Sequence, residues 1–229
     1  MKQFISRTLA CFMLSVFLLF SSVFASAQDY NSSDKKLNHK LDYKPFIVPA
    51  SFIGFGFIGL NSDGINNLNL RIRDDLRYVD HKVNADDYLQ YSPLVLAYSL
   101  NFLGVEGKHS LKDLSMIFGT SFVIMGASVS VIKYTTKIQR PDGSSFKSFP
   151  SGHTANAFMC AEILRQEYGE RSVWYGIAGY VAATATGILR IHNDRHWFTD
   201  VVAGAGFGII STKLAYKLHS AKKNKALPK

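Results

Sequence analysis

Residues 114–132 read LSMIFGTSFVIMGASVSVI, a stretch that contains no charged side chain. Such a run is about long enough to cross a bilayer as one helix. Four further segments, two of them shorter, also lack charge: residues 88–105, 154–161, 172–189 and 201–212. With their flanking residues, these segments predict a helical body that is packed or embedded in a membrane. It would have five membrane helices, or six if residues 45–61 also cross.

The composition limits the class of protein and its partners. The chain has 229 residues, of which 47% are hydrophobic, and a formal net charge of +9. This length suits one domain with a substantial core, and the apolar content excludes a disordered chain. The positive charge suits anionic lipid headgroups or an anionic substrate. We expect no nucleic-acid partner, because the basic residues form no continuous stripe and no nucleic-acid motif accompanies them.

The N-terminus has the pattern of a secretory signal. Lys2 and Arg7 precede the uncharged apolar run Leu9–Phe24, and Ala25-Ser26-Ala27 supplies the small residues of a cleavage site. We therefore expect residues 1–27 to be removed. The alternative is an uncleaved membrane anchor.

The rest of the chain divides into a flexible polar leader, residues 28–44, and a single domain, residues 45–229. Residues 63–87 carry acids and bases together, so we expect a solvated surface segment there. Cys160 is the only cysteine after the signal and is expected to be a small core residue.

The lysines of the tail give an orientation. Residues 217–229 hold five lysines and no acid, which places the tail in the cytoplasm if the last helix spans. Counting back puts residues 133–153 and 190–197 on the outer side. A cleaved signal also places the start of the mature chain on the outer side. The number of crossings agrees with this only if residues 45–61 do not span the membrane, so a re-entrant or interfacial segment is expected there.

Lys133, Arg140 and Pro141 form the first reactive cluster. Lys133 and Arg140 are seven residues apart, or two helical turns, so both can lie on one face and meet one anion. Pro141 is expected to end that helix, with Arg140 at its rim. The guanidinium fork matches phosphate oxygens, and the lysine adds a compact charge. The alternative is a pair of ordinary cations at a helix C-terminus near lipid headgroups.

Pro150-Ser151-Gly152-His153 forms the second cluster and opens an apolar helix. A helix N-terminus presents backbone N–H groups that bind anions. The Ser151 hydroxyl can donate a hydrogen bond, Gly152 allows close approach, and His153 sits where a leaving oxygen would be protonated. A plain helix cap would explain Ser151 but not the histidine beside it.

Arg190, His196 and Asp200 form the third cluster. His196 and Asp200 are four residues apart and are predicted to meet on one helical face. The carboxylate can then accept the Nδ1 proton and leave Nε2 free to attack. Arg190 would neutralise the oxygens of the group attacked. The alternative is an interfacial Trp197 with ordinary caps and ion pairs.

The order and spacing of the three clusters resemble the type 2 phosphatidic-acid phosphatase superfamily, which includes vanadium haloperoxidase-like proteins. Its pattern is Lys-x6-Arg-Pro, Pro-Ser-Gly-His and Ser-Arg-x5-His-x3-Asp. Residues 133–141, 150–153 and 190–200 fit this pattern, and the resemblance covers residues 88–216. Leu189 replaces the motif serine, which removes one phosphate hydrogen bond and bears on the substrate more than on catalysis.

The resemblance implies an all-α bundle with a phosphatase site at one end, and the orientation given above predicts that this is the periplasmic end. It implies that His196 attacks phosphorus, that Asp200 holds His196, and that His153 protonates the leaving alcohol. The residues implied to cradle the phosphate are Lys133, Arg140, Ser151, Gly152 and Arg190. No cofactor or metal is expected, because these cations supply the charge stabilisation of a metal ion and would repel one held by His153, His196 and Asp200.

The resemblance also implies the substrate and the location. Bacterial members act on phosphatidic acid, phosphatidylglycerol phosphate, lipid A phosphate or undecaprenyl pyrophosphate, so we expect a phosphoric ester hydrolase that acts on a lipid in the inner membrane and faces the periplasm. Three alternatives remain: a soluble periplasmic acid phosphatase, a vanadium haloperoxidase, and a non-catalytic lipid-binding or transport protein. The oligomeric state is open.

Overall fold

A computed structural model of the chain describes residues 43–77 and 83–226. Within these ranges it contains eight α-helices and no β-strand, which confirms the predicted all-α fold. The chain divides into two units after Val48, and the larger unit begins at Pro49. The predicted signal, residues 1–27, and nearly all of the predicted leader lie outside the described residues.

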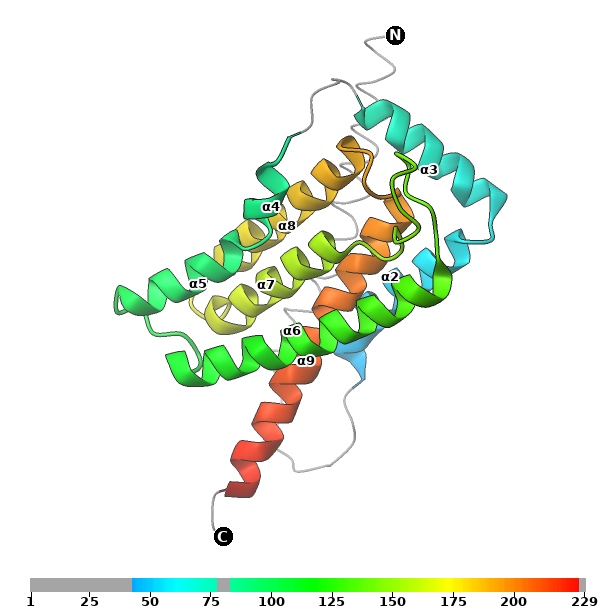
Figure 1. The fold of residues 1–229 in the computed structure, drawn as a ribbon. Coiled ribbons are helices and arrows are strands. Elements are labelled where there is room, and N and C mark those ends of the chain that lie inside the picture. The colour runs from blue at the N-terminus through cyan, green and yellow to red at the C-terminus, as the bar shows by residue number, and fades with distance from the viewer. Residues whose placement is uncertain (1–42, 78–82, 227–229) are drawn as a thin grey trace. The chain divides into compact units, whose positions relative to one another are not determined.

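Figure 1 shows the arrangement of the helices. They are α2 (Lys44–Gly59), α3 (Asp63–Leu76), α4 (Ala85–Leu89), α5 (Ser92–Phe102), α6 (Leu111–Thr136), α7 (Gly152–Tyr168), α8 (Val173–His192) and α9 (Phe198–Ala226).

Helix α7 is the centre of the larger unit and packs against α5, α6, α8 and α9. Nearly all of its side chains are buried, many of them small or apolar, so neighbouring helices can approach it on every side. Met159 and Ile163 join Leu114 and Ile117 of α6 in the main core cluster. Cys160 is fully buried, as predicted for a small core residue.

Helix α9 crosses α7 at two glycines. A Cβ atom on Gly204 would lie 2.5 Å from the Ser151 carbonyl oxygen. A Cβ atom on Gly208 would lie 2.8 Å from the Met159 nitrogen and would overlap the Ala155 carbonyl oxygen. These backbone atoms cannot move aside as a flexible side chain can. The two glycines therefore allow α7 and α9 to approach closely.

One predicted membrane segment differs from the structure. Residues 88–105 do not form one helix, because α4 ends at Leu89 and α5 has only 11 residues. At about 1.5 Å per residue, α5 is too short to cross a bilayer. Among the described residues, α6 alone is long and apolar enough to cross. The pair α2 and α3, which bends by 100°, would pass the same test jointly.

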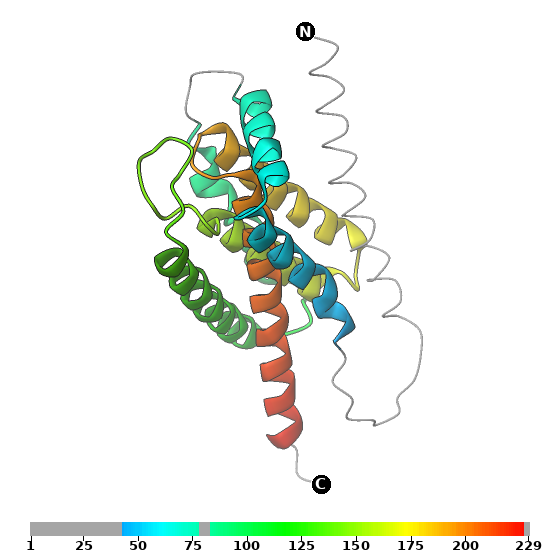
Figure 2. The same ribbon diagram turned by 90° about the vertical axis from the view of Figure 1, so that its right-hand side faces the viewer.

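Four helix ends gather at one end of the larger unit (Figures 1 and 2). They are the C-terminal ends of α6 and α8 and the N-terminal ends of α7 and α9. Backbone hydrogen bonds join the segments between them: Ser151 N–H donates to the Asp200 carbonyl, and His196 N–H donates to the Arg190 carbonyl. The fold thus brings three distant sequence motifs to one place.

We predict that Gly208→Ala destabilises the protein by about 1–3 kcal/mol, because the added methyl group meets backbone atoms of α7. Thermal unfolding in detergent measures the effect. Gly126→Ala is the matched control, because a Cβ at this position in α6 meets nothing within 4 Å. It should leave the melting temperature unchanged or raise it. Equal melting temperatures for the Gly208 variant and the wild type would contradict the close packing.

Candidate active site

The N-terminus of α7 carries the second of the three clusters, Pro150-Ser151-Gly152-His153, which is the second motif of the family pattern. Ser151 is the N-cap, and its side chain accepts a hydrogen bond from the Thr154 N–H. Ser151 is fully buried, and its own N–H is used by the Asp200 carbonyl. The first N–H groups of the helix have no partner within it, so Gly152 and His153 begin a helix end suited to an anion.

The first motif does not lie on one helical face, and that prediction was wrong. Helix α6 ends at Thr136 because Lys137 adopts a left-handed conformation, with φ of 49°, as its C-cap. Arg140 therefore lies in the following loop, and Pro141 does not end the helix. The Arg140 Nε is buried and has no hydrogen-bond partner within the part of the chain that the structure describes. It is available to a bound anion.

Lys133 connects the first motif to the second. Its Nζ lies 2.7 Å from the Lys147 carbonyl oxygen and 3.2 Å from that of Ser148, so it donates to the loop that leads into α7. Its Cε lies 4.0 Å from the position of a Cβ on Gly152. The ammonium group is thus held beside the start of α7.

His196 and Asp200 also differ from the prediction of one helical face. His196 lies in the loop before α9, which begins at Phe198. The two side chains still meet: His196 Nδ1 lies 3.5 Å from Asp200 Oδ2. This distance is too long for a good hydrogen bond, and both Nδ1 and Asp200 Oδ1 lack a partner among the described residues.

Ser148, which the sequence analysis did not single out, holds the Asp200 carboxylate. Its Oγ donates to Asp200 Oδ2 at 2.5 Å, and the Trp197 N–H donates to the same oxygen at 2.9 Å. Asp200 is completely buried. A hydroxyl group two residues before a proline carries no spacing signal, so only the fold could reveal this contact.

Positive charges converge on His196. Burial lowers the pKa of His196 well below its usual range, and the charges of Lys133, Arg190 and Arg140 lower it further. His153 contributes in the same direction. The side chain is only 2% exposed, so water screens these charges poorly. Three of the residues predicted to bind phosphate, Lys133, Arg140 and Arg190, therefore lie close enough to His196 to favour its neutral form.

Arg190 is oriented by an acid from outside the three motifs. Its Nη1 donates to Asp86 Oδ2 at 2.5 Å, and both side chains are buried. The Arg190 Nε has no hydrogen-bond partner among the described residues. One side of the guanidinium is thus fixed by a carboxylate, and another nitrogen remains for an anion.

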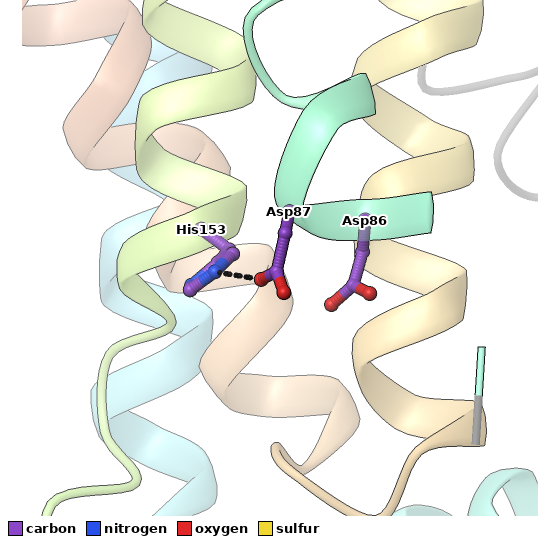
Figure 3. Close-up of side chains that lie close together, drawn as sticks. All are labelled: Asp86, Asp87 and His153. Atoms are coloured by element: carbon purple, nitrogen blue, oxygen red, sulfur yellow. Dashed lines mark hydrogen bonds and ion pairs between the residues drawn. The ribbon is translucent and has the colours of Figure 1, made fainter. Parts of the chain in front are cut away.

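His153 is held by the neighbouring acid (Figure 3). Its Nε2 lies 2.8 Å from Asp87 Oδ1. Burial and the nearby Arg190 lower the pKa of His153, and the hydrogen bond to Asp87 opposes that effect. The imidazole is 33% exposed and so remains open to a substrate.

The predicted solvated character of residues 63–87 was wrong in part. Asp86 is 1% exposed and pairs with Arg190, as described above. Arg73 of α3 donates to Asp194 Oδ1 at 2.7 Å and so fixes the loop before His196. Mixed acids and bases are typical of a solvated face, so sequence alone did not distinguish the residues that reach the site.

Asp86, Asp87 and His153 each offer a ligand atom, and these atoms lie within 4.8 Å of one another. Arg190 already pairs with Asp86, and His153 with Asp87. The positive charge of Arg190 beside them opposes a second cation. We therefore assign no metal to this group.

Comparisons with known proteins agree with the motifs. The family model of the PAP2 superfamily, the type 2 phosphatidic-acid phosphatases, matches residues 114–224. A lipid A 1-phosphatase from Porphyromonas gingivalis is 42% identical over 186 residues, which cover 80% of this chain. The chain spans 39% of the length of that relative.

Two solved structures are similar. The crystal structure of Aquifex aeolicus LpxE matches with a TM-score of 0.51 and 25% identity, over 66% of this chain and 95% of that one. A transmembrane PAP2 type phosphatidylglycerolphosphate phosphatase from Bacillus subtilis matches with a TM-score of 0.47 and 20% identity, over 76% and 96%. With its three motifs gathered at one end of an all-α unit, the chain is similar to the PAP2 superfamily over residues 114–224.

Proposed function

We propose that the protein is a metal-independent phosphatase that hydrolyses a lipid phosphate through a phosphohistidine on His196. The observation that carries this proposal is the buried imidazole of His196, whose Nδ1 lies 3.5 Å from Asp200 Oδ2 and whose pKa is lowered by burial and by the charges of Lys133, Arg190 and Arg140. A neutral imidazole is a competent nucleophile, and the surrounding cations favour a dianionic phosphate.

In the first step, His196 Nε2 attacks phosphorus and a bond forms between nitrogen and phosphorus. The bond to the leaving oxygen breaks, and His153 gives that oxygen a proton. The imidazole of His196 becomes positively charged, and Asp200 lies 3.5 Å from its Nδ1, near enough to tighten into a hydrogen bond as that charge develops. Ser148 and the Trp197 N–H keep the carboxylate in place.

In the second step, His153 takes a proton from water, and the resulting hydroxide attacks the phosphorus. The bond to His196 breaks, inorganic phosphate forms, and both imidazoles return to their starting states. Arg140 and Arg190 each keep a buried guanidinium Nε without a protein partner among the described residues. These donors suit the oxygens of the phosphoryl group in both steps.

A membrane lipid suits the surface of α6. Only 22% of its most apolar 18-residue stretch is buried, unlike the core helix of a soluble protein. Phe122, Val123 and Val131 are among its exposed side chains. Lys133 lies in the last turn of the same helix, so the site would open at the boundary between membrane and water. We place this boundary at the periplasmic face of the inner membrane, in keeping with the basic tail.

The name of the Porphyromonas gingivalis relative supports a lipid substrate. Lipid A phosphate is therefore the first substrate to test, ahead of phosphatidic acid, phosphatidylglycerol phosphate and undecaprenyl pyrophosphate.

The decisive experiment gives these four lipids in detergent micelles to the purified wild type and to His196→Ala. We expect the wild type to release phosphate from at least one lipid, and to do so equally with and without EDTA. The variant should release none, because it lacks the nucleophile. Folding of the variant is checked by its melting temperature. Activity that EDTA abolishes, or full activity in the variant, would refute the proposed mechanism.

The two histidines also predict the pH dependence. His196 must be neutral, so activity persists as the pH falls until it reaches the depressed pKa of His196. His153 must be protonated, so activity declines as the pH rises through its pKa, which is also lowered. We expect the optimum of kcat/KM on the acid side of about 6.5, the ordinary histidine value. A profile that rises steadily into the alkaline range would contradict these protonation states.

A further inference from the structure

Helix α4 contributes to the site although it lies outside residues 114–224, which match the PAP2 superfamily. Its two consecutive acids reach two different residues of the three motifs. Asp87 pairs with His153 (Figure 3), and Asp86 pairs with Arg190. The catalytic histidine of the α7 motif is therefore held by a carboxylate that the three motifs do not include.

We propose that Asp87 is a positioning residue, which orients His153 and stabilises its protonated form. This inference rests on the proposed phosphatase function. The hydrogen bond between Asp87 Oδ1 and His153 Nε2, at 2.8 Å, uses one ring nitrogen. The other nitrogen, Nδ1, is then the one that donates its proton to the leaving oxygen in the first step and takes a proton from water in the second. Asp87 keeps the Nε2 proton in place throughout.

Helix α4 is anchored on both sides, so Asp87 has a fixed position. Before the helix, the Val83 N–H donates to Asn193 Oδ1 at 2.9 Å, and Asn193 Nδ2 donates to the Val83 carbonyl oxygen at 2.8 Å. After the helix, Asn156 Nδ2 donates to Gln90 Oε1 at 3.1 Å. These bonds tie α4 to the end of α8 and to α7, the helix that carries His153.

Among the charged groups near His153, Asp87 is the acid best placed to stabilise the protonated ring. Arg190 of α8 disfavours a positive charge on the ring. Asp86 of α4 favours it but is engaged by Arg190 and by Asn193. Asp87 makes the direct hydrogen bond to the ring and, being 55% exposed, is not needed for packing.

The test compares pH profiles of kcat for the wild type, Asp87→Asn and Asp87→Glu. The substrates are lipid A, phosphatidic acid and para-nitrophenyl phosphate, whose phenolate leaves without a proton. For Asp87→Asn we expect the alkaline limb to move down by about one pH unit, because the ring loses a neighbouring negative charge. Above that limb, hydrolysis of the lipid should fall about tenfold while the aryl phosphate is affected much less. Asp87→Glu should restore part of the lipid activity.

Glu106→Gln is the matched control, because this exposed acid precedes the far end of α6 and should change neither profile. An equal loss on lipid and aryl phosphate without a shifted limb would mean a merely structural role and would overturn the inference. Unchanged profiles in an active Asp87→Asn protein would also overturn it. If Asp87→Asn does not fold, Asp87→Ser gives the same test. Inactivity of the wild type on all three substrates would instead refute the proposed function, and the inference with it.

Discussion

The site depends on three positively charged side chains placed around the buried imidazole of His196. These charges repel one another and oppose protonation of the imidazole. Burial lowers the pKa of His196, and Lys133, Arg190 and Arg140 all lower it further. Such a concentration of positive charge costs stability unless anions compensate it. Asp86 compensates Arg190 directly, and a bound phosphoryl group would compensate the rest. The same repulsion keeps the nucleophile neutral and makes the site selective for an anion.

The fold supports this arrangement with rigid parts. Helix α7 is buried by its neighbours. The glycines of α9 let the N-terminal end of α9, which carries Asp200, pack against the N-terminal end of α7, which begins after Ser151. Charged contacts then fix the loops: Arg73 holds Asp194, and Arg195 donates to Asp142. The positions of His196 and Arg140, both outside helices, follow from these contacts and not from helical periodicity.

The residues of the three motifs could be predicted from the sequence, because their spacing is specific and their chemistry suits one anion. Their local geometry could not. Two helical faces were expected where the chain forms loops, because a spacing of four or seven residues fits a helix but does not require one. Ser148, Asp86 and Asp87 were missed for a different reason. They meet the site only through tertiary contacts, and Asp86 and Asp87 lie more than 60 residues from the groups that they hold.

The covalent intermediate on His196 is the most direct test of the central claim. His153→Ala, given an aryl phosphate with a labelled phosphoryl group, should still form the intermediate but break it down slowly, because water lacks its base. After quenching in alkali, where phosphohistidine is stable, we predict label on the peptide that contains His196 and none in the double variant that also carries His196→Ala. Label on a different residue, or phosphate release by the wild type with no labelled protein under any quench, would contradict the account.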